Sequence, residues 1–342
     1  MYYLYSANYI LSELDILPEN IYYFYNLKQK GNIFMIDVLF KAFSFVAVIV
    51  CGYIIKKKGG FGDSALKLVS ALALNITLPA SVISSFAAFK KDNTIFMLML
   101  LGLGINLAMS FFAFVISRKR SRGIGILYMM NCPGFNIGSF SLPFIQGFIG
   151  PSGVVTACMF DTGNALMTCG GNYALTCAAV GSGAGKKFGV KDFAYKLLSS
   201  VPFDTYLAAL LLAIFNVRLP QPAVNLLSTA AGANGFMAML MLGLSLDFDI
   251  SKEYMTEIIK LLILKYGLAA FCAYIIYFKL PLDSLLKSVL TIIVFSPTSA
   301  LVPAFTQKLD GNVKASGFIA SASIVISVAV ITIIIAATNF NV

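Results

Sequence analysis

The sequence predicts an all-α polytopic membrane protein with ten transmembrane helices. Of its 342 residues, 59% are hydrophobic and 12% are charged, whereas soluble domains carry about 25% charged residues. Its apolar segments approach the roughly 20 residues that a helix needs to cross a bilayer. Lysine and arginine lie in short clusters between these segments, as residues that set membrane topology do. The net charge of +10 therefore does not indicate a nucleic-acid partner.

The first half of the chain contains five of the predicted spans. The first ends at three lysines, residues 56–58, and the second contains Pro79. The third ends directly before Arg118, and the fifth has Asp161 as its one charged residue. These spans are residues 36–55, 65–89, 94–117, 125–149 and 153–180.

The second half contains the other five predicted spans. The sixth is the shortest of the ten, and the ninth is interrupted by two prolines. These spans are residues 201–215, 222–246, 258–277, 284–306 and 314–338.

Four parts follow from this order. They are an N-terminal extension (1–33), a first five-helix repeat (34–180), a cytoplasmic linker (181–200) and a second five-helix repeat (201–342). The extension has no basic region of the kind that begins a cleavable signal, so we expect an interfacial or loosely ordered segment. Because each half has an odd number of spans, the second half enters the membrane upside down relative to the first. Such inverted repeats are typical of secondary transporters.

The distribution of basic residues predicts that both termini lie outside the cell. With that orientation, sixteen basic residues fall on inner segments and seven on outer segments. The inner ones are Lys56, Lys57, Lys58, Lys67, Arg118, Lys119, Arg120, Arg122, Lys186, Lys187, Lys191, Lys196, Lys252, Lys260, Lys308 and Lys314. The outer ones are Lys28, Lys30, Lys90, Lys91, Arg218, Lys279 and Lys287. The expected location is the plasma or inner membrane.

The fourth and ninth spans are interrupted at matching positions. Residues 131–143 read "NCPGFNIGSFSLP", and residues 296–303 read "SPTSALVP". Proline removes a backbone donor and breaks a helix, and hydrocarbon cannot satisfy the polar atoms of Asn and Ser. Paired interruptions of this kind point to a transport site. The alternative is that the prolines kink the two helices without function.

The residues of these interruptions form the candidate substrate site. Broken helices expose half-helix N-termini that can hold an anion without a buried basic side chain. Two further asparagines occupy corresponding positions in spans two and seven and face either the pocket or a neighbouring helix. The candidates are Asn131, Pro133, Asn136, Ser139, Pro143, Ser296, Pro297, Thr298, Ser299, Pro303, Asn75 and Asn234.

Asp161 is the one acid deep within a predicted span, and Asn164 lies one turn further along the same helix face. Intramembrane carboxylates are costly and functional by default. We expect Asp161 and Asn164 to bind a coupling cation, either a proton or Na⁺. The alternative is a hydrogen bond that fixes the fifth span against the fourth. Asp204 and Lys265 lie within the first third of their spans, and we expect their side chains to snorkel to the interface.

Nothing in the sequence indicates an enzyme, a metal site or a cofactor. All six cysteines lie inside apolar runs, without a C-x-x-C pair, and the chain contains no histidine. No nucleophile is paired with a base.

The order and spacing of these residues resemble the auxin efflux carrier family, which includes plant auxin exporters and bacterial malate-permease-like proteins. The fourth span of that family has an asparagine, a proline and a glycine at intervals of seven, which here are Asn136, Pro143 and Gly150. Ser141 stands where the family usually has glycine. Other residues that match are Gly52, Tyr53, the lysines at 56–58, Pro79 and "FDTGN" at 160–164. The resemblance covers residues 36–338.

The resemblance implies a bile-acid-symporter-like fold in which helices 4 and 9 are broken and cross at the membrane centre. Spans 3–5 and 8–10 would form a moving transport domain, and spans 1, 2, 6 and 7 a scaffold. The implied function is secondary active transport of a small organic anion by alternating access. A non-transporting receptor or channel on the same fold is the alternative. The expected partners are the anion, a proton or sodium ion and membrane lipids. The sequence leaves open whether the protein forms a homodimer.

Overall fold

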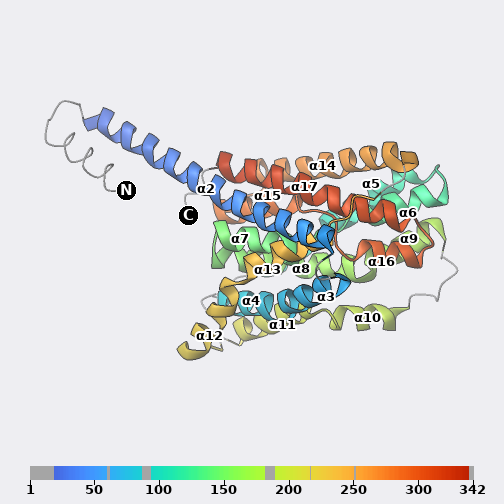
Figure 1. Ribbon diagram of the computed structural model, residues 1–342, viewed down its shortest axis with the longest axis horizontal. Helices are drawn as coiled ribbons and strands as arrows, with labels where there is room; N and C mark the ends of the chain where they lie inside the picture. The colour runs from blue at the N-terminus through green and yellow to red at the C-terminus, as the bar shows by residue number, and fades with distance from the viewer. Residues whose placement is uncertain are drawn as a thin grey trace.

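The structure, a computed structural model, describes residues 19–59, 62–86, 94–181, 189–215, 217–249 and 252–338. Its regular elements in these residues are helices (Figure 1), which confirms the all-α part of the prediction. The first half contains α2 (Glu19–Lys58), α3 (Gly62–Leu72), α4 (Leu78–Phe86), α5 (Thr94–Ser117), α6 (Arg122–Asn131), α7 (Leu142–Phe148), α8 (Pro151–Leu166) and α9 (Asn172–Val180). The second half contains α10 (Val190–Leu198), α11 (Val201–Ile214), α12 (Gln221–Gly232), α13 (Asn234–Ser245), α14 (Met255–Phe278), α15 (Ser284–Val294), α16 (Val302–Lys308) and α17 (Val313–Thr338).

The chain is an integral membrane protein. Within the described ranges, 6 helical segments are long and apolar enough to cross a membrane, and a bent pair made by α10 and α11 would be a seventh. The 6 are Leu39–Lys58, Ser64–Phe86, Phe96–Ser117, Gln221–Ser245, Met255–Phe278 and Val313–Ala337. The predicted fourth, fifth and ninth spans are divided into shorter helices. Ten spans in two inverted repeats therefore remain a prediction.

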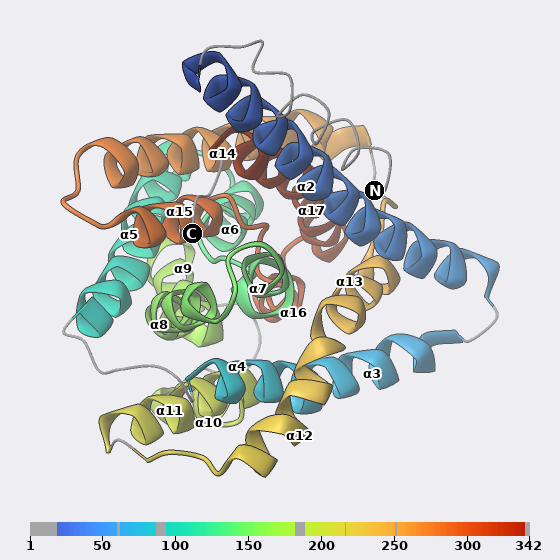
Figure 2. The same ribbon diagram turned by 90° about the vertical axis from the view of Figure 1, so that its left-hand side faces the viewer.

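The helices pack in two groups. In one, α13 packs on α2 and α3, and α4 packs on α11 and α12. In the other, α5 packs on α8, α6 on α9, α14 on α15, and α16 on α17. Figure 2 shows α3, α4, α11 and α12 as a layer along the bottom of the view, below α5–α9. The groups meet where α8 packs on α4 and α11, and where α17 packs on α2.

Glycines allow the closest helix contacts within both groups. A Cβ on Gly163 of α8 would overlap the backbone carbonyl of Met99 in α5. A Cβ on Gly243 of α13 would likewise overlap the carbonyl of Ile49 in α2. Small residues permit such close approach between membrane helices. The glycine of "FDTGN" is thus explained by helix packing.

Helix α2 extends beyond the bundle at one end of the molecule (Figure 1). It has 40 residues, which gives a length of about 60 Å, against roughly 30 Å for the hydrocarbon core. Its first half covers the end of the predicted N-terminal extension, of which residues 1–18 lie outside the described residues. The start of α2 and the end of α17 lie toward the same end of the molecule. Which end faces outward remains a prediction.

Candidate functional site

The first interruption lies between α6 and the helical segment that continues into α7. Helix α6 ends at Asn131, and residues 132–136 are not helical before the π-helical turn Ile137–Ser141 begins. Pro133 has no N–H group with which to continue the helix. Gly134 has a φ of 85°, in the left-handed region that glycine adopts readily. The break therefore falls at the front of "NCPGFNIGSFSLP".

Pro143 and Pro303 lie just beyond the breaks. Pro143 occupies the first turn of α7, and Pro303 occupies the first turn of α16. Pro303 is tolerated there because the first N–H groups of a helix have no intrahelical partner. Pro143 instead follows the π-helical turn Ile137–Ser141 directly, within one continuous helical segment. The non-helical residues of the two breaks contain Pro133 and Pro297.

The second interruption separates α15 from α16, and it contacts the first. Phe135 and Thr298 form an antiparallel bridge. The backbone N–H of Asn136 donates a hydrogen bond to the carbonyl of Pro297 at 2.9 Å. The two segments predicted to be broken are therefore in direct backbone contact.

Amide side chains of neighbouring helices satisfy the backbone groups that the first break leaves free. Asn164 of α8 accepts from the N–H of Phe135 at 3.1 Å and donates to the carbonyl of the same residue at 2.9 Å. Asn106 of α5 accepts from the N–H of Gly134 at 2.6 Å. Buried backbone groups need such partners. The break is thus held by residues from two other helices.

Lys265 of α14 also contacts the first break. Its side chain is 1% exposed, and its ammonium donates to the carbonyls of Cys132 at 3.0 Å and Gly134 at 3.4 Å. The expectation that Lys265 snorkels to the interface is therefore wrong. Its long aliphatic stem instead carries the charge into the protein interior.

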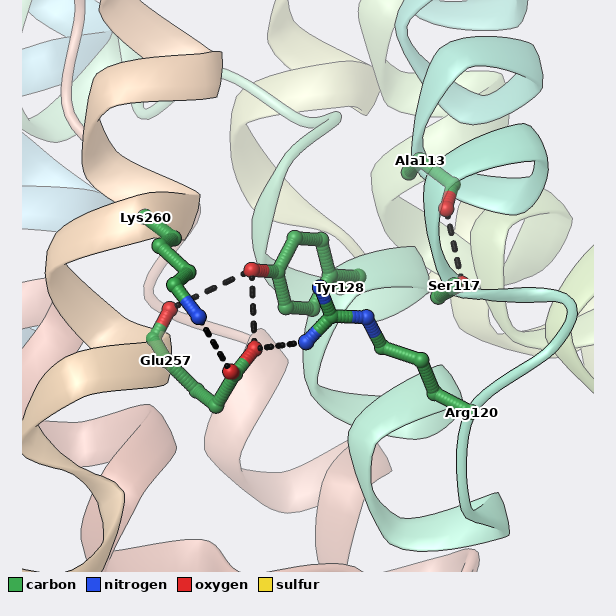
Figure 3. A network of polar contacts seen from close by, with 6 residues as sticks. All are labelled: Ala113, Ser117, Arg120, Tyr128, Glu257 and Lys260. Atoms are coloured by element: carbon green, nitrogen blue, oxygen red, sulfur yellow. Dashed lines mark hydrogen bonds and ion pairs between the residues drawn. The ribbon is translucent and has the colours of Figure 1, made fainter.

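A polar network fixes α14 beside α6 (Figure 3). Glu257 of α14 accepts hydrogen bonds from Arg120 at 2.7 Å and from Tyr128 of α6 at 3.1 Å. It also pairs with Lys260 at 3.0 Å. Tyr128 lies one turn before the end of α6, so the network stabilises the approach to the first break.

A cavity of about 460 Å³ opens beside the two breaks. Asn136 and Ser139 border it from the first break, and Ser299 borders it from the second. Two more of the predicted site residues border this cavity. They are Asn75, between α3 and α4, and Asp161 of α8. Its volume lies in the range of small-molecule sites.

A second cavity of about 300 Å³ shares two of these residues. Asn136 and Ser139 border both cavities, and Thr298 and Pro303 border the second one. Other residues of its wall come from α3, from α17 and from the end of α13. The first break therefore lies between the two cavities.

The side chains of three predicted site residues have no hydrogen-bond partner in the part of the chain that the structure describes. The side chains of Asn136, Ser139 and Asn75 form no hydrogen bond with any residue that the structure describes. Asn136 is nevertheless only 7% exposed. Because buried amides are normally hydrogen-bonded, this amide is available to a ligand in either cavity.

Other predicted polar residues have protein partners instead. Asn131 donates to the hydroxyl of Ser316 at 2.9 Å. Ser296 shares a short hydrogen bond with Ser141. The hydroxyl of Thr298 donates to the carbonyl of Asn131 at 3.1 Å. These contacts join the two breaks to each other and to α17.

Asn234 bridges helices outside both cavities. It is 1% exposed, accepts from Thr77 at 3.2 Å and donates to Gln146 of α7 at 3.2 Å. The sequence left open whether Asn234 faces the pocket or a neighbouring helix. In the structure it faces neighbouring helices.

Asp161 is held by two donors at the cavity wall. Its two carboxylate oxygens accept from Asn164 at 2.7 Å and from Tyr206 of α11 at 2.9 Å. The oxygen of Asn164 faces the N–H of Phe135, so Asn164 presents its nitrogen to Asp161. A Cβ on Gly138 would lie 2.8 Å from the hydroxyl of Tyr206, so glycine leaves room for this contact. Nothing local in the sequence singles out Tyr206.

The segment predicted as a linker contributes a cation to the cavity. Helix α10 lies within it, and its Lys196 borders the larger cavity. The Lys196 ammonium lies 3.9 Å from the centre of the Phe305 ring in α16. In the sequence Lys196 cannot be told from Lys191, which is exposed on the same helix.

Comparisons with known proteins point to transport. No family model matches the chain. A protein of Methanothermobacter thermautotrophicus described as an uncharacterized transporter is 23% identical over 220 residues. The alignment covers 63% of this chain and 70% of that protein. Together with the apolar helices, this similarity supports a transporter rather than an enzyme.

Proposed function

We propose that this protein is a secondary active transporter of a small organic anion, with its substrate site in the larger cavity beside the two breaks. The observation that carries the proposal is the unpartnered amide of Asn136. It lies 7% exposed at the point where two interrupted helices meet, and it borders both cavities. A polar group in that position, without a hydrogen-bond partner among the described residues, suits a ligand that enters and leaves.

The chemistry of the cavity wall favours an anion with an apolar body. Lys196 provides a positive charge, and Asn136 and Ser139 provide donors. Leu74 and Phe203 are among the apolar residues of the same wall. Ligand sites commonly combine an apolar lining with a few convergent polar groups.

We further propose the architecture that the resemblance implies. The interrupted helices α6–α7 and α15–α16 are the fourth and ninth of ten spans in two inverted repeats. Helices α5–α9 and α14–α17 form the moving transport domain, and α2–α4 with α11–α13 form the scaffold. The grouping of helix contacts supports this division. It is the arrangement of the auxin efflux carrier family, in a cell membrane with both termini outside.

The conformation described corresponds to an inward-facing state in this proposal. Helix α10, on the predicted inner side, borders the larger cavity, and Leu66 and Ser70 of α3 border the smaller one. Alternating access would close these two cavities on the inner side and open the site to the outside.

Asp161 is the proposed carrier of the coupling ion. Asn164 turns its nitrogen toward Asp161, so the pair does not present two oxygens to a metal cation. This favours a proton over Na⁺, since protonation needs only the carboxylate.

Replacing Lys196 by glutamine is expected to raise the KM for the anion. The loss of one partly screened charge corresponds to about 1 kcal/mol, or roughly fivefold in affinity. Uptake of a radiolabelled carboxylate into proteoliposomes measures the effect. Lys191→Gln, an exposed lysine on the same helix, is the matched control and should leave KM unchanged. An unchanged KM in Lys196→Gln would remove Lys196 from the site.

The second candidate function is a receptor or channel on the same fold. A receptor would bind the anion and show no flux, and a channel would show flux that does not saturate. Saturable uptake by the parent protein distinguishes the carrier from both.

A further inference from the structure

Lys265 lies on the buried face of α14, where the helical pattern calls for an apolar residue. Its neighbours on that face, Ile258, Leu261 and Ala269, are 0%, 0% and 2% exposed. A buried ammonium is costly unless its charge is compensated. Within the described residues, no carboxylate lies within ion-pair distance of it. Lys265 therefore needs another source of negative charge.

The broken helix provides that charge. The ammonium donates to the carbonyls of Cys132 and Gly134, and it lies 5.3 Å from the centre of the Phe135 ring. These carbonyls stand at the C-terminal end of α6, where the helix dipole is negative. The ring face adds a cation–π attraction. A compact charge with three donors fits such a set of acceptors.

We propose that the Lys265 ammonium is a tethered substitute for an inorganic monovalent cation at the first break. In carriers with discontinuous helices, unwound backbone carbonyls coordinate Na⁺. Here the corresponding carbonyls are already occupied by a covalently attached cation. The proposal rests on the proposed function, because it assigns a positioning role within the same broken helix. It makes the transport cycle independent of Na⁺ and leaves ion coupling to Asp161.

The test compares the parent and two variants in proteoliposomes with Na⁺ and with N-methylglucamine as its replacement. The parent should transport the anion equally well in both media. Lys265→Met, which keeps an unbranched side chain of similar length and removes the charge, should lose transport in both. Lys279→Ala, an exposed lysine at the end of the same helix, should behave like the parent.

A binding readout separates a cation site from a merely structural lysine. Lys265→Ala leaves a space that matches propylammonium. The thermal midpoint of this variant in detergent should rise with added propylammonium or Na⁺, and 1-propanol should not raise it. The parent should respond to neither cation. If Lys265→Ala does not fold, the transport rate of Lys265→Met tests the proposal instead.

Three outcomes would overturn the proposal. They are a parent whose transport requires Na⁺, a Lys265→Met variant that transports at the parental rate, and a folded Lys265→Ala variant that no cation stabilises. A parent that transports no anion in either medium would instead refute the proposed function. In that case the thermal midpoints of Lys265→Ala still test the cation site.

Discussion

Replacing Asp161 by asparagine is expected to abolish anion uptake driven by a proton gradient and to leave substrate exchange largely intact. Asparagine has the shape of the carboxylate, and it can still bond to Asn164 and Tyr206, which lie 2.7 and 2.9 Å from the Asp161 oxygens. What it cannot do is bind and release a proton. Exchange needs no net ion movement, so it should continue.

The measurement is uptake of radiolabelled anion into proteoliposomes, with and without an imposed pH gradient. Driven uptake by Asp161→Asn should fall to the level of protein-free liposomes, while exchange between internal and external anion persists. Asp204→Asn, an exposed acid in α11, is the control and should retain both activities. Driven uptake at the parental rate in Asp161→Asn would mean that the carboxylate only fixes α8 against α11.

Replacing Asn164 by alanine is expected to lower the stability of the folded protein more than any other single substitution at the proposed site. This side chain donates to Asp161 and Phe135, and it accepts from Phe135 and Asn106. Its removal leaves the N–H and carbonyl of Phe135 buried without partners. Each unsatisfied group costs about 1–3 kcal/mol, a large part of the roughly 5–15 kcal/mol that typically stabilises a domain.

The thermal midpoint in detergent measures this loss. Asn225→Ala, at an exposed position of α12, is the matched control and should leave the midpoint unchanged. If Asn164→Ala melts like the parent, the break is not held by its amide, and another explanation for the conformation of residues 132–136 is needed.

The breaks themselves were predictable because proline and glycine act locally. A Pro-Gly pair in the middle of a predicted helix, as at Pro133 and Gly134, disrupts that helix. Its counterpart at Pro297 lies at the matching place in the second half. The sequence could not reveal which polar residues remain free. Asn131 and Asn136 are five residues apart, yet one bonds to α17 and the other borders the cavities.

The partners that hold the site were missed for a different reason. Tyr206, Lys196 and Lys265 reach it from other helices, and their positions depend on tertiary packing. For Lys265, depth within a span suggested snorkelling, because the carbonyls that accept from it are exposed only by a distant break. Asn106 did carry a signal, since a polar residue in the middle of an apolar span usually bonds across helices.

Counterflow of a radiolabelled organic anion in proteoliposomes tests most directly whether the cavity beside the breaks is a transport site. The substrate is chosen from mono- and dicarboxylates that raise the thermal midpoint in detergent. Liposomes preloaded with unlabelled anion should accumulate the label transiently and saturably. Asn136→Ala should raise the half-saturating concentration about ten- to a hundredfold, as expected for about 1–3 kcal/mol, without lowering the thermal midpoint. No counterflow of any such anion by the parent, or an unchanged half-saturation in Asn136→Ala, would contradict the account.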